Sequence, residues 1–139
     1  MNYKINSVNI LVIGDLMLDH YIYGNCNRIS PEAPVPVVEV KQDDYTLGGA
    51  GNVLQNLIAF NCSANIISIT GDDDDAITVN YQLSKAGISD ARVIRDKKRC
   101  TTVKSRVMVS NHQLIRLDRE DTRPIDEDIV NLLTDAIKF

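Results

Sequence analysis

Short, continuous apolar runs alternate along this chain with segments whose apolar residues recur at helical spacing. The runs at 9–14 and 64–69 are strand-sized and rich in β-branched residues, as in strands buried in a sheet, and 9–14 is expected to be buried on both faces. A further short strand is predicted at 91–94. Helical spacing predicts helices at 53–60, 76–86 and 127–138. Strand–helix units with right-handed crossovers predict a parallel sheet between two layers of helices, which is a three-layer α/β body.

Four further segments alternate apolar and polar residues, as in strands that are solvated on one face. They lie at 19–24, 35–40, 102–109 and 113–117. Because such strands do not fit a sheet covered by helices, we expect a small β-strand lid built from two excursions, at about 19–43 and 100–119. The segment 25–36 is rich in proline and is predicted to be an irregular or extended connection.

Composition and charge mainly exclude certain partners and certain kinds of site. With a net charge of -4 and a pI near 5.0, the chain offers no overall field for nucleic acid or an anionic membrane, so neither partner is expected. Any anionic substrate must then be held by a few placed cations. The three cysteines form no paired motif, so neither a disulfide framework nor a zinc site is predicted. Free thiols and the absence of a signal-peptide pattern at 1–9 favour a cytoplasmic protein.

The first candidate site follows the predicted strand 9–14, in the stretch Gly14-Asp15-Leu-Met-Leu-Asp19. Ligands of open α/β sheets bind beyond the carboxyl ends of the strands, so Asp15 and Asp19 lie where a site is expected. A carboxylate there can accept two hydrogen bonds from neighbouring hydroxyls, each contributing about 1.5–3 kcal/mol. The alternative is that one of the two caps a turn while the other is solvated.

The second candidate is Gly48-Gly49-Ala50-Gly51-Asn52, a glycine turn that opens a predicted helix. Glycine lets the backbone approach a ligand, the free N–H groups of a helix start face that ligand, and Asn52 offers both a donor and an acceptor. The alternative is a tight turn that only caps the helix. No Gly-Lys-Ser/Thr follows, which excludes a Walker A loop, and the first strand lacks the GxGxxG of a dinucleotide site.

The third candidate is a set of polar side chains on the second excursion, here called the lid polar set: Lys104, Arg106, Gln113 and Arg116, with Asp118 beside them. Two cations that are two residues apart point from the same strand face and repel unless solvent or an anion lies between them. A sugar phosphate would supply that anion. A solvated strand face is the alternative. The run 97–99 is interpreted as a solvated turn, and the acidic run 72–75 as charge at a helix start.

Five segments carry a resemblance to a known family: Ile13-Gly-Asp-Leu-Met-Leu-Asp19, Arg28-Ile-Ser-Pro-Glu-Ala-Pro-Val-Pro-Val37, Gly48-Gly-Ala-Gly-Asn52, Thr101-Thr-Val-Lys-Ser-Arg106 and Gln113-Leu-Ile-Arg-Leu-Asp118. In this order they resemble the start of the heptose 7-phosphate kinase domain of the ribokinase-like (PfkB) family of carbohydrate kinases. The segment that begins at Arg28 is specific to this branch, whereas the glycine turn is shared across the family. The resemblance covers nearly the whole chain and somewhat less than half of such a domain.

The resemblance implies a ribokinase-like fold with a β lid. It implies phosphoryl transfer from ATP, with Mg²⁺, to the anomeric hydroxyl of heptose 7-phosphate, on the route to ADP-heptose for the lipopolysaccharide core. It also implies that Asp19, Gly48, Gly49 and Asn52 hold sugar hydroxyls, and that family members form a homodimer through the lid. The role of the lid polar set near the substrate phosphate is our hypothesis from charge and placement.

One departure from the family bears on activity. Kinases of this family carry a late Gly-Ala-Gly-Asp turn, which forms an anion hole and activates the acceptor hydroxyl, and this sequence has no match to it. We therefore expect residues 1–139 to be the N-terminal, substrate-binding part of the domain, with no catalytic residue, no bound metal or ATP and no kinase activity alone. Two alternatives stay open: a non-catalytic sugar-phosphate-binding protein and a module that dimerises through the lid.

Overall fold

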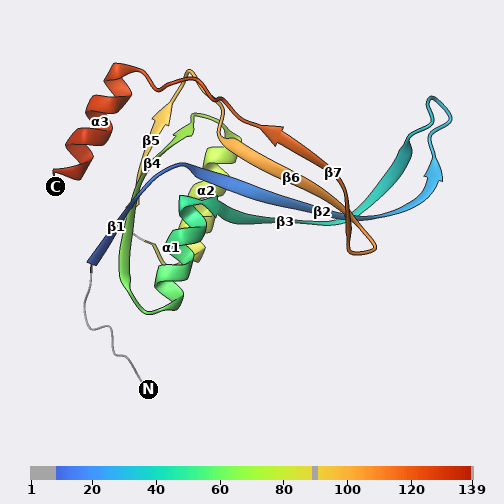
Figure 1. Ribbon diagram of the computed structural model, residues 1–139, viewed down its shortest axis with the longest axis horizontal. Coiled ribbons are helices and arrows are strands. Elements are labelled where there is room, and N and C mark those ends of the chain that lie inside the picture. The colour runs from blue at the N-terminus through green and yellow to red at the C-terminus, as the bar shows by residue number, and fades with distance from the viewer. Residues whose placement is uncertain (1–8, 89–90, 139) are drawn as a thin grey trace.

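The computed structural model describes residues 9–88 and 91–138 and folds them into two sheets and three helices (Figure 1). The strands are β1 (Asn9–Ile13), β2 (Leu16–Ile29), β3 (Pro36–Gly49), β4 (Ser63–Gly71), β5 (Arg92–Asp96), β6 (Thr102–Val109) and β7 (His112–Arg119). The helices are α1 (Ala50–Ala59), α2 (Asp74–Lys85) and α3 (Glu127–Ile137). None of these helices is long and apolar enough to cross a membrane.

The three-stranded sheet has the order β1-β4-β5, and both of its pairings are parallel. Figure 1 shows α1 and α2 on one side of this sheet and α3 on the other. The α2 helix ends before Gly87, whose φ of 80° lies in the left-handed region that favours glycine. The α/β body predicted from the apolar runs is confirmed.

The central strand β4 and the edge strand β1 of this sheet differ in how far they are buried. Ile66 and Ile67 are neighbours in β4 that point to opposite faces, and they are 0% and 2% exposed. In β1, Leu11 and Ile13 are 45% and 55% exposed, whereas Val12 packs against the core. The expectation that the first run is buried on both faces is therefore wrong for the described residues, because α1 covers one face of β1 and the other face stays open.

The core lies between the three-stranded sheet, α1, α2 and the near end of the four-stranded sheet. Leu18 of β2, Leu47 of β3, Leu54 of α1, Ile66 of β4 and Val79 of α2 are all fully buried in it. Burying a side chain of this size stabilises the fold by about 1.5–3 kcal/mol. Because β2 and β3 contribute to this core, the base of the four-stranded sheet is fixed to the α/β body.

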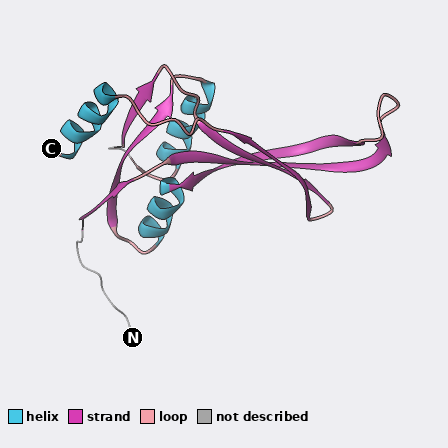
Figure 2. Ribbon diagram, turned by 45° about the horizontal axis from the view of Figure 1, so that its top comes forward, coloured by secondary structure: helices cyan, strands magenta, loops and turns pink. Residues whose placement is uncertain are grey.

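The four-stranded sheet has the order β3-β2-β6-β7 and joins the two excursions of the chain. Its centre is the parallel pair β2–β6, in which Leu18 lies beside Val103, and an antiparallel partner flanks each of the two strands. Figures 1 and 2 show β2 and β3 continuing as a long hairpin past the ends of β6 and β7. The expectation of β strands from two excursions that form one sheet outside the α/β body is confirmed, and we call this sheet the lid.

The hairpin of β2 and β3 is longer than the sequence predicts. β2 continues to Ile29 through two register shifts, and β3 includes residues 41–44, which are all polar and exposed. The irregular connection expected at 25–36 is therefore confined to 30–35. Main-chain hydrogen bonds to β2 hold this polar stretch in the ladder, and Pro36 is tolerated as the first residue of an edge strand.

Candidate functional site

Asp19 lies on one face of the lid, beside residues of both neighbouring strands. Along β2, Leu16 and Leu18 point into the core, so Asp19 points the other way. The strand register places Thr46 of β3 and Lys104 of β6 beside it. We call the face of the lid that carries Asp19 and Lys104 the site face.

Gly48 lies directly against the Asp19 carboxylate. A Cβ atom at position 48 would stand 2.5 Å from Asp19 Oδ2 and 2.9 Å from Met17 Cγ, which is closer than non-bonded atoms approach one another. A residue with a side chain would therefore displace the carboxylate. The structure thus brings together Asp19, which follows the first strand, and Gly48, which precedes the first helix.

Gly49 makes a similar close approach to Asp15. Its φ of 56° is in the left-handed region, and a Cβ atom there would overlap the Asp15 carbonyl oxygen. The same oxygen accepts a hydrogen bond from the Ala50 N–H at 2.9 Å, which ties the start of α1 to the turn after β1. Asp15, Asp19, Gly48 and Gly49 therefore lie together.

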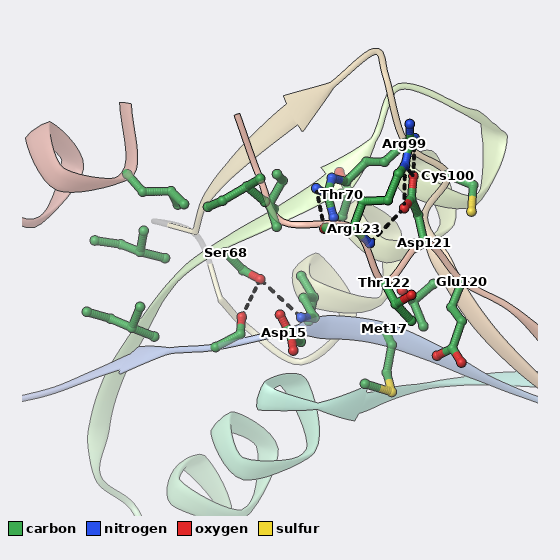
Figure 3. Close-up of a pocket in the computed structure, with 18 residues that line it drawn as sticks. Asp15, Met17, Ser68, Thr70, Arg99, Cys100, Glu120, Asp121, Thr122 and Arg123 are labelled. Carbon is green, nitrogen blue, oxygen red and sulfur yellow. Dashed lines mark hydrogen bonds and ion pairs between the residues drawn. The ribbon is translucent and has the colours of Figure 1, made fainter. Parts of the chain in front are cut away.

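A hydroxyl of β4 holds the turn that carries Asp15. Ser68 Oγ donates to the Gly14 carbonyl oxygen at 2.6 Å and accepts from the Leu16 N–H at 3.1 Å (Figure 3). Ser68 is buried, so water does not compete for these bonds. Asp15 is thus presented at the carboxyl end of β1 by a residue that the sequence analysis did not single out.

Arg106 joins β6 to Asp19. The two side chains form an ion pair in which each is 22% exposed, and the guanidinium carbon lies 5.3 Å from the centre of the Tyr21 ring. A partly buried pair with a cation–π contact is held more firmly than an exposed pair. Arg106 therefore holds the Asp19 carboxylate from one side, while Gly48 leaves space for it on the other.

Lys104 and Arg116 of the lid are also paired with carboxylates of this chain. Lys104 Nζ contacts Asp118 Oδ2 at 3.2 Å and also Glu120, whose hydrogen bond raises the pKa of the Lys104 ammonium. Arg116 Nε contacts Asp118 Oδ1 at 2.8 Å, and this bond lowers the pKa of Asp118. The register places Arg116 beside Arg106 on the site face. The anions next to these cations are therefore the chain's own carboxylates.

Two of the expected site residues make no contact with this cluster. Gln113 pairs with Met108 near the turn of the β6–β7 hairpin. Met108 is four residues beyond Lys104, so Gln113 lies about 13 Å further along the strands. Asn52 is the third residue of α1 and is exposed, and within the described residues its side chain makes no hydrogen bond. The structure thus keeps Asn52 one turn from the glycines but does not bring Gln113 to them.

A cavity of about 510 Å³ opens beyond the carboxyl ends of β1 and β4 (Figure 3). Its polar lining comes from the β1–β2 turn, from β4 and from the segments before β6 and after β7. The polar residues of the lining include Asp15, Ser68, Thr70, Arg99, Glu120, Asp121 and Arg123. Its size suits a small ligand. The cavity lies where open α/β sheets bind their ligands.

The cavity continues onto the site face of the lid. Met17 and Thr102, which line the cavity, are partners in the β2–β6 ladder, and the pair of Asp19 and Lys104 comes two residues further along the same face. Glu120 also lines the cavity and contacts Lys104. The cavity and the site face therefore form one candidate site.

Thr70 brings a buried hydroxyl to the cavity wall. The residue is 3% exposed, and its Oγ1 has no hydrogen-bond partner among the described residues. An unpaired buried hydroxyl costs about 1–3 kcal/mol, so a ligand that reached it would gain a bond at a place already desolvated. The sequence carries no signal for this role, because Thr70 lies inside an apolar strand.

Two arginines form the wall of the cavity opposite the lid strands. Arg123 pairs with Asp121 at 2.5 Å and lowers the pKa of that carboxyl group. Arg99 pairs with the buried Asp96 at 3.0 Å, and its side chain is 13% exposed. The interpretation of 97–99 as a solvated turn is therefore wrong for Arg99, because a buried carboxylate holds its guanidinium inward.

The acidic run 72–75 interacts within the chain. Asp73 caps α2 by accepting from the Ala76 N–H at 3.0 Å, and it also accepts from the N–H and the hydroxyl of Thr101, at 2.8 and 2.6 Å. Burial alone would raise the pKa of Asp73, but these hydrogen bonds outweigh it and lower the pKa. Asp72 pairs with Arg95 and Asp75 with Arg119. The interpretation as charge at a helix start is confirmed.

The candidate site offers carboxylates, a hydroxyl, the N–H groups of a helix start and cations, which together suit a polyol that carries an anionic group. The described parts of the chain contain no group of three or more His, Cys, Asp or Glu side chains placed to hold a metal ion. The carboxylates, hydroxyl and cations of the site support recognition of a polar ligand.

Relatives of known sequence extend this picture. Residues 8–136 match the family described as pfkB family carbohydrate kinase. The chain is 44% identical over 133 residues to the bifunctional protein HldE of Campylobacter curvus, and 47% identical over 125 residues to that of Helicobacter hepaticus. These alignments cover 94% and 90% of this chain but only 28% and 26% of the relatives. The chain thus spans about a quarter of their length and corresponds to their N-terminal part.

Solved structures share the fold at low sequence identity. Phosphofructokinase-2 from Escherichia coli, in complex with fructose-6-phosphate, is 18% identical with a TM-score of 0.67, over 95% of this chain and 41% of that one. A carbohydrate kinase from Agrobacterium tumefaciens is 21% identical with a TM-score of 0.62, over 79% of this chain and 34% of that one. The expected ribokinase-like fold is confirmed.

Proposed function

Because the match over residues 8–136 shows that this chain belongs to the pfkB family of carbohydrate kinases, we propose that it forms the sugar-phosphate-binding part of a heptose 7-phosphate kinase. The proposed kinase transfers a phosphoryl group from ATP, with Mg²⁺, to the anomeric hydroxyl of the heptose. It works in the cytoplasm, on the route to ADP-heptose. The described residues contribute recognition of the sugar to this reaction.

The observation that carries the proposal is the contact between Asp19 and Gly48 beside the cavity. The carboxylate fills space that only a glycine leaves, and Arg106 holds it from the other side. Its direction is therefore set before a ligand arrives, which lowers the entropy lost on binding. A carboxylate held in this way suits two neighbouring hydroxyls of a sugar.

The phosphate of the substrate is assigned in this proposal to the cations of the site face. These cations are Lys104, Arg106 and Arg116. Lys104 is next to the cavity, because Glu120 lines the cavity and contacts Lys104. Arginine binds phosphate in a bidentate manner, and lysine binds it as a compact charge. The lid would then bind both ends of the ligand: Asp19 would bind its hydroxyls, and the neighbouring cations would bind its phosphate.

Nucleotide, metal ion and catalytic base are assigned to residues outside this sequence. The sequence contains no match to the Gly-Ala-Gly-Asp turn of the family. We therefore propose that the 139-residue polypeptide binds sugar phosphate and transfers no phosphoryl group on its own. ATP-dependent phosphorylation of heptose 7-phosphate by the purified polypeptide would contradict this part of the proposal.

Calorimetric titration with heptose 7-phosphate tests the proposed function. We expect saturable binding by the wild type and weaker binding by Asn52→Ala, with loss of one or two hydrogen bonds and thus about threefold to tenfold in affinity. Asn56→Ala is the matched control, because Asn56 is exposed on the same helix one turn further on and, among the described residues, its amide group hydrogen-bonds only the main chain of Asn52, at 3.0 Å from the carbonyl oxygen. Absence of binding by the wild type would refute the proposed function. Equal binding by both variants would remove Asn52 from the site.

A second candidate function, dimerisation through the lid, is favoured by apolar side chains on β7. Ile115 and Leu117 are 50% and 52% exposed, and they lie on the face of β7 opposite the site face. Neighbouring apolar side chains that are exposed in this way mark a surface for interaction with another protein. A second copy of the chain is the proposed partner. Sedimentation analysis should show a dimer that Leu117→Asp dissociates. A dimer that forms equally with and without heptose 7-phosphate, in a chain that binds no sugar, would favour this function over the first.

A further inference from the structure

Glu120 lies at the boundary between the cavity and the lid. It follows the last pair of the β6–β7 ladder, Val103 with Arg119, and so begins the connection to α3. Its carboxylate contacts Lys104 Nζ, and its side chain lines the cavity. Lys104 is only 11% exposed on its side chain, whereas Glu120 is 40% exposed. The carboxylate therefore covers the ammonium on the side from which a ligand would enter.

We propose that Glu120 is a placeholder for the phosphate of the substrate: it neutralises Lys104 while the site is empty, and a bound phosphate group displaces it. This inference rests on the proposed function, because it assigns the phosphate of a sugar phosphate to Lys104. A carboxylate and a phosphate offer the same kind of acceptor oxygens to an ammonium group, and the phosphate carries the larger charge.

Of the two carboxylates that contact Lys104, Glu120 can be displaced from it more easily than Asp118. Asp118 lies within the ladder opposite Lys104, and Arg116 also holds it, at 2.8 Å. Glu120 lies outside the ladder, has the longer side chain and pairs with Lys104 alone among the described residues. Releasing Glu120 therefore breaks one partly exposed ion pair, whereas releasing Asp118 would disturb two cations and the strand.

The charges of this cluster explain why a release is needed. Lys104 and Arg116 carry two positive charges, and Asp118 and Glu120 carry two negative charges, so the cluster is neutral. A phosphate dianion added to a neutral cluster would face two carboxylates at short range. With Glu120 turned to solvent, one positive charge is available to the phosphate. A sugar without a phosphate does not need to displace Glu120, so the competition from this carboxylate acts on phosphorylated ligands alone.

The test is calorimetric titration of the 139-residue chain with heptose 7-phosphate and, separately, with the unphosphorylated heptose. The competition from Glu120 lowers the measured affinity, so Glu120→Gln should bind heptose 7-phosphate about threefold to tenfold more tightly than the wild type. Its affinity for the unphosphorylated heptose should not change. Glu39→Gln is the matched control, because Glu39 also pairs with a lysine of the lid, Lys41 at 2.5 Å, on β3 and away from the cavity.

A second variant guards against loss of folding. Glu120→Asp keeps the charge but shortens the side chain, so it should also tighten binding of heptose 7-phosphate, and circular dichroism should show that both variants are folded. Wild-type binding that neither variant tightens would overturn the placeholder and leave the proposed function standing. Tightening by Glu39→Gln as well would overturn it too, because the effect would then be one of net charge. A wild type that binds no sugar phosphate would refute the proposed function, and the placeholder with it.

Discussion

Asp19 and Gly48 share one space: Asp19 Oδ2 lies 2.5 Å from the position that a Cβ atom at residue 48 would take. Gly48→Ala should therefore push the carboxylate out of its position between β3 and Arg106. We expect affinity for heptose 7-phosphate to fall at least about tenfold, because the hydrogen bonds from the sugar to a charged acceptor are lost. Calorimetric titration measures this change.

The control for Gly48→Ala is Gly87→Ala. Gly87 has a φ of 80°, and a Cβ atom there would meet nothing within 4 Å, so the substitution strains the backbone away from the site. It should lower the free energy of unfolding by about 1 kcal/mol and leave the affinity unchanged. If Gly48→Ala bound heptose 7-phosphate as well as the wild type does, the close approach of Gly48 would have no role in binding.

Asp73 should contribute stability that depends on pH. Its pKa in the folded chain is lowered from the ordinary 3.8, so its contribution is present above that pH and is lost as the pH falls through the lowered value. Asp73→Asn loses an acceptor for Thr101, and we expect the free energy of unfolding at pH 7 to drop by about 1–2 kcal/mol. Urea denaturation at pH 7 and at about pH 2.5 should show that the difference shrinks in acid.

Asp74→Asn is the control for this effect. Asp74 lies in the same first turn of α2 but is exposed and makes no side-chain hydrogen bond within the described residues. Its loss should cost only the smaller interaction of a carboxylate with a helix start, about 0.3–1 kcal/mol. Equal losses for the two variants would show that the bonds to Thr101 do not stabilise the fold.

Thr70 and Ser68 line the same cavity and should respond differently to loss of their hydroxyl groups. Thr70 Oγ1 has no partner among the described residues, so Thr70→Val should keep or raise the free energy of unfolding while it weakens binding of heptose 7-phosphate. Ser68→Ala removes two hydrogen bonds around the turn at Asp15 and should cost about 1–3 kcal/mol. Denaturation and titration of both variants measure this contrast. A Thr70→Val chain destabilised as much as Ser68→Ala would show that the hydroxyl is paired within the protein.

The sequence predicts most of the fold because the fold depends on local periodicity. Apolar runs indicate β1, β4 and β5, and alternation indicates β6 and β7. The polar part of β3 at 41–44 has no alternation, and its ladder to β2 depends on main-chain bonds that any sequence can make. The exposed face of β1 also has no local signal, because burial depends on which elements cover a strand.

The candidate site is predicted only where its residues follow a strand or open a helix. Asp15, Asp19 and the glycine pair meet this condition, and the structure places them together. The pairing of Asp19 with Arg106 joins residues 87 positions apart, and the roles of Thr70 and Glu120 depend on the cavity that they line. Such relationships exist only in the folded chain, so a pattern of neighbouring residues cannot indicate them.

Titration of heptose 7-phosphate into the wild type, Asp19→Ala and Asp44→Ala tests the central claim most directly. Asp44 is an exposed carboxylate of β3 that the register places beside Tyr21, so its loss removes the same charge from the same face of the lid. We predict at least about tenfold weaker binding for Asp19→Ala and wild-type binding for Asp44→Ala. Equal affinities for all three proteins would contradict the claim that Asp19, held by Gly48 and Arg106, binds the sugar.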